Sequence, residues 1–247
     1  MNKLLITGFL IFNSLNCFST CIAIYIANNG NIYVAADSKR TFLFNDDKSK
    51  FESVCKIHNV GNNYFAVSGF DDGFLLKAAN ESLQQNEDIG AAIKAFGSTM
   101  TKRYKKLMEE ARTYYPENFH QFLSDGLGEV SFFGFYKGTP KIVDVQFTVA
   151  LDKNDKVITS YKVRPVLNLT VIGISRDITH ANPSELPSPA IMNDNPELFV
   201  ESLVQIEVRK QPRAVGDPID LLKLTPEGPV WIKKNENVVA YEQRGTF

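Results

Sequence analysis

The sequence predicts an α+β fold, a four-layer αββα sandwich in which two β-sheets stack face to face between outer helices. The expected elements come in the order strands, two helices, strands, one helix, strands, with no internal repeat and no domain linker. The early strands are apolar on both faces, which is typical of a sheet that is covered on both sides. Two stacked sheets with helices on both outsides would cover every apolar face.

The first twenty residues have the pattern of a secretory signal peptide: Lys3, an apolar run over 4–12, then small or polar residues. The apolar run is shorter than the roughly 20 residues that span a bilayer. We therefore expect residues 1–20 to be a signal peptide or another removed leader, residues 21–247 to form a single domain, and the protein to be secreted or periplasmic. The alternative is a buried first strand or helix of a cytosolic protein.

Composition excludes several classes of partner and site. The chain has 27 basic and 28 acidic residues, so we expect neither nucleic acid nor an anionic membrane as partner. We also expect no integral membrane segment once the leader is removed. Of the three cysteines, Cys17 would leave with the leader, and Cys21 and Cys55 make neither a disulfide framework nor a metal site. We expect no cofactor and no metal.

The first half of the chain predicts two strand pairs and then two helices. Strands at 22–27 and 32–36 flank the turn Asn28-Asn29-Gly30-Asn31, a strong hairpin signal. A polar loop is expected over 41–53, and a second strand pair at 54–60 and 64–68. Helices are expected over 71–85 and 88–113, the second with Asp88 as N-cap and an apolar stripe at helical spacing.

The second half returns to strands before one helix and a closing hairpin. Strands are expected at 129–136, 140–151, 156–163 and 169–174. The Pro-, Ser- and Asn-rich segment 181–195 predicts a surface loop, a candidate lid or pocket rim. Asn195 and Pro196 then begin a helix that runs to about Lys210. The last expected hairpin has strands at 219–225 and 230–234.

Several motifs, in this order and at this spacing, resemble the proteasome-type branch of the N-terminal-nucleophile (Ntn) hydrolases. They are Val34-Ala35-Ala36-Asp37-Ser38, Val54-Cys55-Lys56-Ile57, Ala66-Val67-Ser68-Gly69, Gly216-Asp217-Pro218-Ile219-Asp220 and Gly228-Pro229-Val230-Trp231-Ile232. The resemblance covers the whole chain after the leader. It implies a four-layer Ntn fold, an amide-bond hydrolase (an amidohydrolase or peptidase) acting on a peptide or small amide, and possible self-association as a homo-oligomer.

The resemblance also implies roles for individual residues. The new N-terminal side chain would be the nucleophile, and its own α-amine the base. Asp37 matches the acid after the second strand, and Lys56 matches the lysine beside the nucleophile. Gly69 matches the glycine whose N–H helps hold the oxyanion, and Ser175 lies near the family's helper serine.

Two residues compete for the role of nucleophile. Counting back from Asp37 over the family's usual sixteen positions gives Cys21. Thr20, the family's commoner residue type, needs one inserted residue in the turn. Signal-peptidase preference favours a cut before Thr20, because a cut before Cys21 puts the bulky Phe18 at a small-residue position. Self-cleavage before Cys21, or trimming of Thr20, would remove that objection, and we favour Cys21.

The chemistry is consistent with these residue types. An α-amine has an ordinary pKa of roughly 7.7–8.0 and can act as a base near neutral pH, so no histidine is required. A lysine ammonium next to a thiol would lower the pKa of that thiol, and Asp37 would keep Lys56 charged. The alternatives are a structural Asp37–Lys56 ion pair and a plain strand-end glycine at position 69.

Further observations leave other interpretations open. A Cys21–Cys55 disulfide is an alternative, although Cys55 and Lys56 should point to opposite faces of one strand, so only one of them can meet Cys21. Pro212 and Val215 occupy positions where the family often has Asp and Ser, polar partners of the terminal amine. Their presence favours a second hypothesis, a catalytically silent member that serves as a binding or assembly module.

Overall fold

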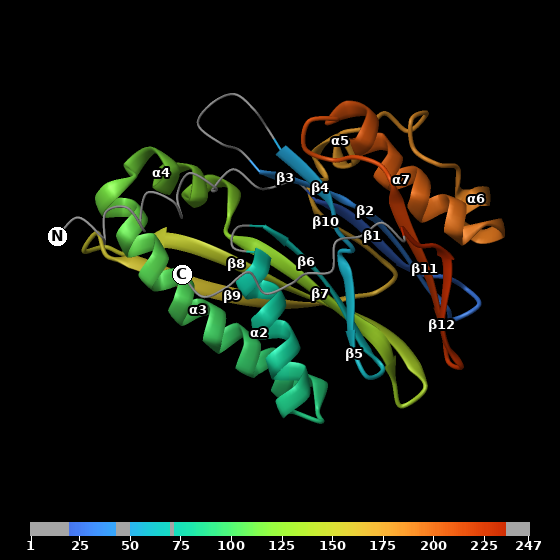
Figure 1. The fold of residues 1–247 in the computed structure, drawn as a ribbon, viewed down its shortest axis with the longest axis horizontal. Helices are drawn as coiled ribbons and strands as arrows, with labels where there is room; N and C mark the ends of the chain where they lie inside the picture. Colours follow the sequence, from blue (N-terminus) through green and yellow to red (C-terminus); the bar gives the residue numbers. More distant parts are fainter. Residues whose placement is uncertain (1–19, 43–49, 70–71, 236–247) are drawn as a thin grey trace.

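The computed structural model describes residues 20–42, 50–69 and 72–235 of the 247-residue chain. These residues form an α+β fold with two five-stranded antiparallel sheets, a two-stranded ribbon and six helices (Figure 1). The predicted α+β class is confirmed. The predicted leader lies outside the described residues, except for Thr20. None of the helices in the described ranges combines the length and the apolar character needed to cross a membrane.

The first sheet has the strand order β10-β1-β2-β11-β12. Its strands are β1 (Cys21–Ile26), β2 (Ile32–Asp37), β10 (Leu169–Gly173), β11 (Ile219–Thr225) and β12 (Gly228–Lys233). The predicted first hairpin is confirmed, with Ile22 opposite Ala36. On its other edge β1 pairs with β10, so that Cys21 lies opposite Gly173. The end of β2 and the end of β10 therefore meet at the start of β1.

The second sheet follows the chain order from β5 to β9. Its strands are β5 (Ile57–Val60), β6 (Asn63–Gly69), β7 (Gly128–Tyr136), β8 (Thr139–Leu151) and β9 (Val157–Val166). Residues 54–56, expected as the beginning of a strand, precede β5 as an irregular segment. The loop expected over 41–53 is wrong in part, because β3 (Lys39–Phe42) and β4 (Lys50–Ser53) pair as a polar ribbon. Residues 43–49 lie outside the described residues.

The described helices are α2 (Asp72–Gln85), α3 (Ile89–Tyr114), α4 (Pro116–Asp125), α5 (Arg176–Thr179), α6 (Pro189–Asp194) and α7 (Pro196–Lys210). The N-cap role of Asp88 is confirmed, since its side chain accepts a hydrogen bond from the Ala91 N–H at 2.8 Å. Pro196 begins α7 as predicted. The sequence analysis missed α4, α5 and α6. The last of these lies inside the expected loop 181–195, where Ser188 caps it and Pro189 takes its first position.

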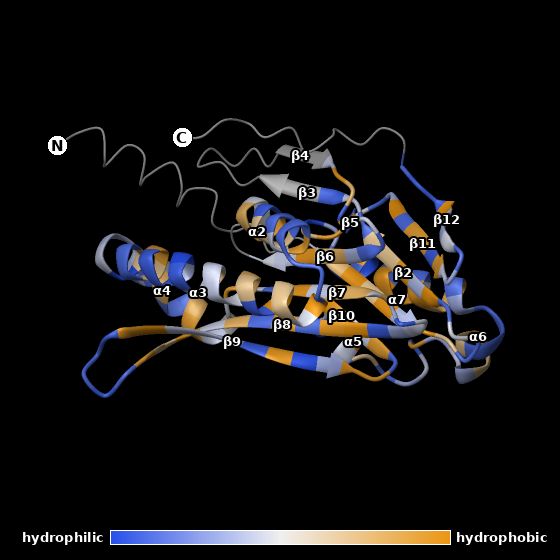
Figure 2. Ribbon diagram, turned by 90° about the horizontal axis from the view of Figure 1, so that it is seen from below, coloured by the Kyte–Doolittle hydropathy of each residue, from blue (hydrophilic) through white to orange (hydrophobic). Residues whose placement is uncertain are grey.

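Three apolar cores hold these elements together. One joins α2, α3 and α4 to the second sheet, one joins α7 to the first sheet, and the third lies between the two sheets. Figure 1 shows α7 over β1 and β2, and Figure 2 shows apolar residues concentrated on the strands. Alternation along β1 points Ile22 and Ile24 toward the second sheet and Cys21, Ala23 and Tyr25 toward α7. Both faces of the first sheet are thus buried along β1 and β2.

Candidate active site

Asp37 is the centre of a buried polar cluster at the end of β2. One carboxylate oxygen, Oδ1, accepts hydrogen bonds from the Cys21 main-chain N–H and from Lys56 Nζ, each at 2.8 Å. The main-chain nitrogen of Cys21 and Lys56 Nζ are therefore no more than twice 2.8 Å apart. Asp37 has no exposed surface, and Lys56 is also buried. We call Cys21, Asp37 and Lys56, with the groups that bond to them, the Asp37 cluster.

Both carboxylate oxygens of Asp37 are held. The second, Oδ2, accepts from the main-chain N–H groups of Lys39 at 3.2 Å and Gly216 at 3.3 Å. Lys56 Nζ makes a further hydrogen bond to the Lys39 carbonyl at 2.7 Å. Burial raises the pKa of Asp37, and the charge and hydrogen bond of Lys56 oppose that rise. The lysine and the carboxylate are thus fixed in one geometry beside the start of β1.

The Cys21 thiol lies on the α7 side of the first sheet and is fully buried. Its pKa is raised well above the ordinary value, first by burial and then by the charges of Asp37 and Glu207, while Lys56 lowers it only in part. Lys56 thus acts on the pKa of the thiol in the expected direction, but burial and the two carboxylates outweigh it in this structure.

The peptide bond before Cys21 is held from the other edge of the strand. The carbonyl of Thr20 accepts a hydrogen bond from the Ile174 N–H at 2.7 Å. Gly173 has a φ of +86°, and a Cβ there would lie 2.1 Å from the Thr20 oxygen and 2.6 Å from Ser68 Oγ. A residue with a side chain cannot fit so close to this peptide. Asp37 on one side and Ile174 on the other thus fix the bond between Thr20 and Cys21.

Gly69 and Ser175 are the two other residues to which the resemblance gives a role in the site. Gly69 ends β6 with a φ of +121°, and a Cβ there would come 2.3 Å from Gly128 Cα on the paired strand. Close strand packing therefore already explains this glycine. Ser175 precedes α5 and makes no capping side-chain hydrogen bond. Within the described part of the chain, no hydrogen bond joins Gly69 or Ser175 to Asp37.

Glu207 is a residue of this region that the sequence analysis missed. It is fully buried on α7, and its Oε1 accepts from the Ile178 N–H at 2.9 Å. Its other oxygen, Oε2, is buried without a hydrogen-bond partner among the described residues. Burial raises the pKa of Glu207, and the neighbouring Asp177 carboxylate adds to the rise.

Glu207 lies close enough to Cys21 for its charge to act on the thiol, and the helix and strand spacings are consistent with this. The rings of Tyr25 on β1 and Phe199 on α7 pack edge to face, 5.3 Å apart. Four residues along a strand span about 13 Å, from Tyr25 to Cys21. Eight residues along a helix span about 12 Å, from Phe199 to Glu207. The sequence does carry a signal for Glu207, because this glutamate falls on the same helical stripe as the apolar residues Phe199 and Leu203.

The segment 212–216 supplies main-chain groups where polar side chains were expected. Val215 is fully buried in the core between α7 and the first sheet. The Pro212 carbonyl accepts from Lys39 Nζ at 2.5 Å, and Gly216 donates its N–H to Asp37. The segment does come beside Asp37, as the resemblance implies, but the side chains of Pro212 and Val215 carry no polar group.

The disulfide alternative is wrong in this structure. Cys21 and Cys55 are both free thiols. Cys55 packs against the core between the two sheets, whereas Cys21 packs against α7 on the opposite face of the first sheet. Burial raises the pKa of Cys55 to about 11. The described residues also contain no group of three or more histidine, cysteine or acidic side chains placed to hold a metal ion.

No family model matches the chain, and no curated protein matches it.

Proposed function

We propose that this chain is an Ntn hydrolase of the proteasome-like branch, with a four-layer αββα sandwich, that hydrolyses an amide bond in a peptide or small amide. The observation that carries the proposal is the single Asp37 oxygen that binds both the Cys21 N–H and Lys56 Nζ at 2.8 Å. The three apolar cores, one on each side of a sheet and one between the sheets, support the four-layer arrangement.

Cys21 is the nucleophile in this proposal. Asp37 holds the main-chain nitrogen of Cys21 itself, so cleavage before Cys21 would leave a free α-amine next to Lys56. The Lys56 ammonium would lower the pKa of that amine and keep part of it unprotonated near neutral pH. With Thr20 as the first residue, this nitrogen would remain an amide, which is a poor base. The Asp37 contacts therefore favour Cys21 over Thr20.

Release of the leader could use the same groups. The Cys21 sulfur would attack the Thr20 carbonyl carbon, and the Ile174 N–H that already bonds to the Thr20 oxygen would stabilise the negative charge formed there. The C–N bond between Thr20 and Cys21 would then break to give a thioester and a free amine. Water would hydrolyse that thioester and restore the thiol.

Turnover follows the general course of nucleophilic catalysis. The α-amine of Cys21 takes the thiol proton, and the sulfur attacks the substrate carbonyl carbon. The C–N bond breaks as the leaving amine takes the proton from the α-ammonium, which leaves a thioester on Cys21. A water molecule then gives a proton to the α-amine and attacks the thioester. The C–S bond breaks, the sulfur takes the proton from the α-ammonium, and the acid is released. We assign the Gly69 N–H to the oxyanion and Ser175 to a supporting role at the amine.

Glu207 is our proposed replacement for the polar partners that Pro212 and Val215 do not supply. A freed α-ammonium carries more N–H groups than Asp37 Oδ1 can accept, and a buried ammonium needs partners for all of them. Glu207 lies on α7 with its Oε2 unpartnered among the described residues, and its charge acts on Cys21. Glu207 would act as a positioning residue for the amine.

A second candidate function is a catalytically silent binding or assembly module. The fully buried thiol with a raised pKa and the apolar Val215 beside it favour this alternative. Under it, Asp37 and Lys56 would be a structural ion pair that joins β2 to the segment before β5.

The two functions are distinguished by intact-mass measurement of the exported protein before and after treatment with iodoacetamide. The Cys55→Ser variant should begin at Cys21 and gain one label, whereas Cys21→Ser should keep its leader and gain no label at position 21. Fractionation of the producing cells tests the secreted or periplasmic location, and sedimentation tests self-association. A mature chain that begins ahead of Thr20, or labelling of the wild type at Cys55 alone, would support the binding module instead.

A further inference from the structure

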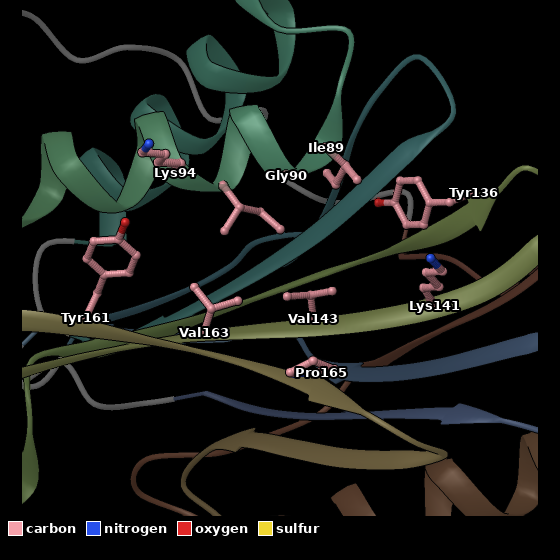
Figure 3. A pocket seen from close by; sticks show the side chains of 10 residues that line it. Ile89, Gly90, Lys94, Tyr136, Lys141, Val143, Tyr161, Val163 and Pro165 are labelled. Carbon is pink, nitrogen blue, oxygen red and sulfur yellow. The ribbon is translucent and has the colours of Figure 1, made fainter.

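A cleft of about 330 Å³ lies between the first turns of α3 and strands β7 to β9 of the second sheet (Figure 3). It lies on the helix-covered face of that sheet, apart from the Asp37 cluster. Its middle is apolar, with Ile93 on the helix side and Val143 and Val163 on the sheet side. The volume is at the small end of the range for ligand pockets. The cleft therefore suits a compact molecule with an apolar body.

One end of the cleft carries an unused hydrogen-bond donor and a cation. The hydroxyl of Tyr136 is buried and has no hydrogen-bond partner in the described ranges, and Figure 3 shows it directed inward, toward Ile89. Lys141 stands next to it on β8, because Lys141 lies opposite Gly134, two residues before Tyr136. Gly134 has no side chain to separate the two. Burial also raises the pKa of Tyr136, so the phenol stays a neutral donor.

The other end of the cleft is closed by Tyr161 and Lys94. The ring of Tyr161 lies so close to Gly97 of α3 that a Cβ there would come 2.5 Å from it. Neither Lys94 nor Lys141 forms an ion pair with any described residue, and no aspartate or glutamate lines the cleft. The lining side chains thus provide hydrogen-bond donors and positive charge at the two ends of the cleft. None of them is a carboxylate.

We propose that this cleft binds a small monocarboxylate with an apolar body. The carboxylate would accept a hydrogen bond from the Tyr136 hydroxyl and pair with Lys141, and the body would lie between Ile93 and Val163. A single ammonium and a single phenol match one negative charge, whereas a phosphate dianion normally recruits more donors. A cationic ligand would meet two lysines and no acid. This binding does not depend on the proposed hydrolase activity.

Calorimetric titration with three probes that share one tail tests the proposal: octanoate, octan-1-ol and octylammonium, each below its aggregation range. Octanoate should bind at least tenfold more tightly than octylammonium, because the tails are alike and only the carboxylate can accept from Tyr136 and pair with Lys141. Lys141→Met should weaken octanoate about tenfold, as expected for the loss of a charge-assisted contact, and leave octan-1-ol unchanged. Tyr136→Phe should weaken octanoate severalfold.

The matched control is Lys153→Met, in the exposed turn between β8 and β9, which removes the same charge away from the cleft. It should leave octanoate affinity unchanged. Equal affinity for the three probes would overturn the proposal. The same holds if octanoate fails to bind, or if Lys141→Met and Lys153→Met weaken it equally, since both results would reduce the effect to general surface charge.

Discussion

Asp37 and Asp144 are both buried with both carboxylate oxygens hydrogen-bonded, but by donors of different kinds. Asp144 on β8 accepts from the hydroxyls of Ser131 and Thr170 and from the guanidinium of Arg164. All these donors are side chains, and Thr170 lies on the first sheet, so Asp144 joins the two sheets. Asp37 accepts three of its four hydrogen bonds from main-chain N–H groups.

Under the proposed hydrolase function, this difference separates a carboxylate that holds the sheets together, Asp144, from one that serves the chemistry, Asp37. The donors of Asp144 are on neighbouring strands and would serve to fix the packing of the sheets. The main-chain donors of Asp37 hold it in place, so Lys56 is not needed to satisfy its hydrogen bonds and instead brings a charge next to the Cys21 nitrogen. A buried charge of this kind is costly unless it is paired. Mutations in the two clusters should therefore have different effects.

The largest effect is expected for Lys56→Met. It leaves the Asp37 carboxylate buried without its cation, so the free energy of unfolding should fall by about 3–5 kcal/mol. Urea denaturation measures this, and labelling of Cys21 in the mature chain should be lost. The control is Lys210→Met, which breaks the exposed pair with Glu185 and should cost less than about 1 kcal/mol. Equal losses of unfolding free energy in Lys56→Met and Lys210→Met would show that Lys56 has no special role.

Gly173→Ala should have the next largest effect. The new Cβ would meet the Thr20 carbonyl at a position of positive φ, so a loss of about 2–4 kcal/mol is expected from overpacking and backbone strain together. Gly30→Ala is the matched control, because Gly30 has a φ of +78° and no atom within 4 Å of a built Cβ. It should lose only the strain, about 1 kcal/mol. Mass spectrometry should also show less cleavage before Cys21 in Gly173→Ala alone.

Asp144→Asn tests the other carboxylate of the comparison. The amide keeps one acceptor oxygen, so one of the two hydroxyls, Ser131 or Thr170, loses its acceptor. The free energy of unfolding should fall by about 1–3 kcal/mol, measured by urea denaturation. Labelling of Cys21 should remain as in the wild type. If labelling fell as far as it does in Lys56→Met, the two carboxylates would not differ in role.

Glu207→Gln should have the smallest effect on stability and a clear dependence on pH. Burial raises the pKa of Glu207, so the proton it binds stabilises the folded state below its ordinary pKa of 4.5, and this contribution is lost as pH rises through the folded value. Glutamine does not titrate, so the variant keeps its stability as pH rises through this range. Its stability relative to wild type should therefore increase as pH is raised above 4.5 in denaturation experiments.

The same variant tests whether Glu207 acts on Cys21. Asp37, Glu207 and Lys56 are the charged groups that act on this thiol, and removal of the Glu207 charge should lower its pKa. The rate of alkylation of Cys21 should then rise at a lower pH than in wild type, whereas Cys55, with a pKa of about 11, should not change. An unchanged profile at Cys21 would assign Glu207 to the Ile178 contact alone.

Strong local signals explain what was predicted well. The Asn-Asn-Gly-Asn turn, the Asp88 cap and Pro196 each act within a few residues, and the hairpin, α3 and α7 are all confirmed. The β3–β4 ribbon was missed because its strands are polar and lack the apolar pattern of a buried strand. The short helices α5 and α6 were missed because one or two turns leave no measurable periodicity.

The candidate site divides in the same way. The sequence by itself determined the strand pattern and the residue types at its ends, including the placement of Asp37 at the end of β2. Only the tertiary structure decided that Gly216, 179 residues away, would donate to Asp37, that Ile174 would hold the Thr20 carbonyl, and that Glu207 would lie close enough to Cys21 for its charge to act on the thiol. The physical reason is that turns and caps are formed by neighbouring residues, whereas these contacts exist only once the sheets and α7 have packed.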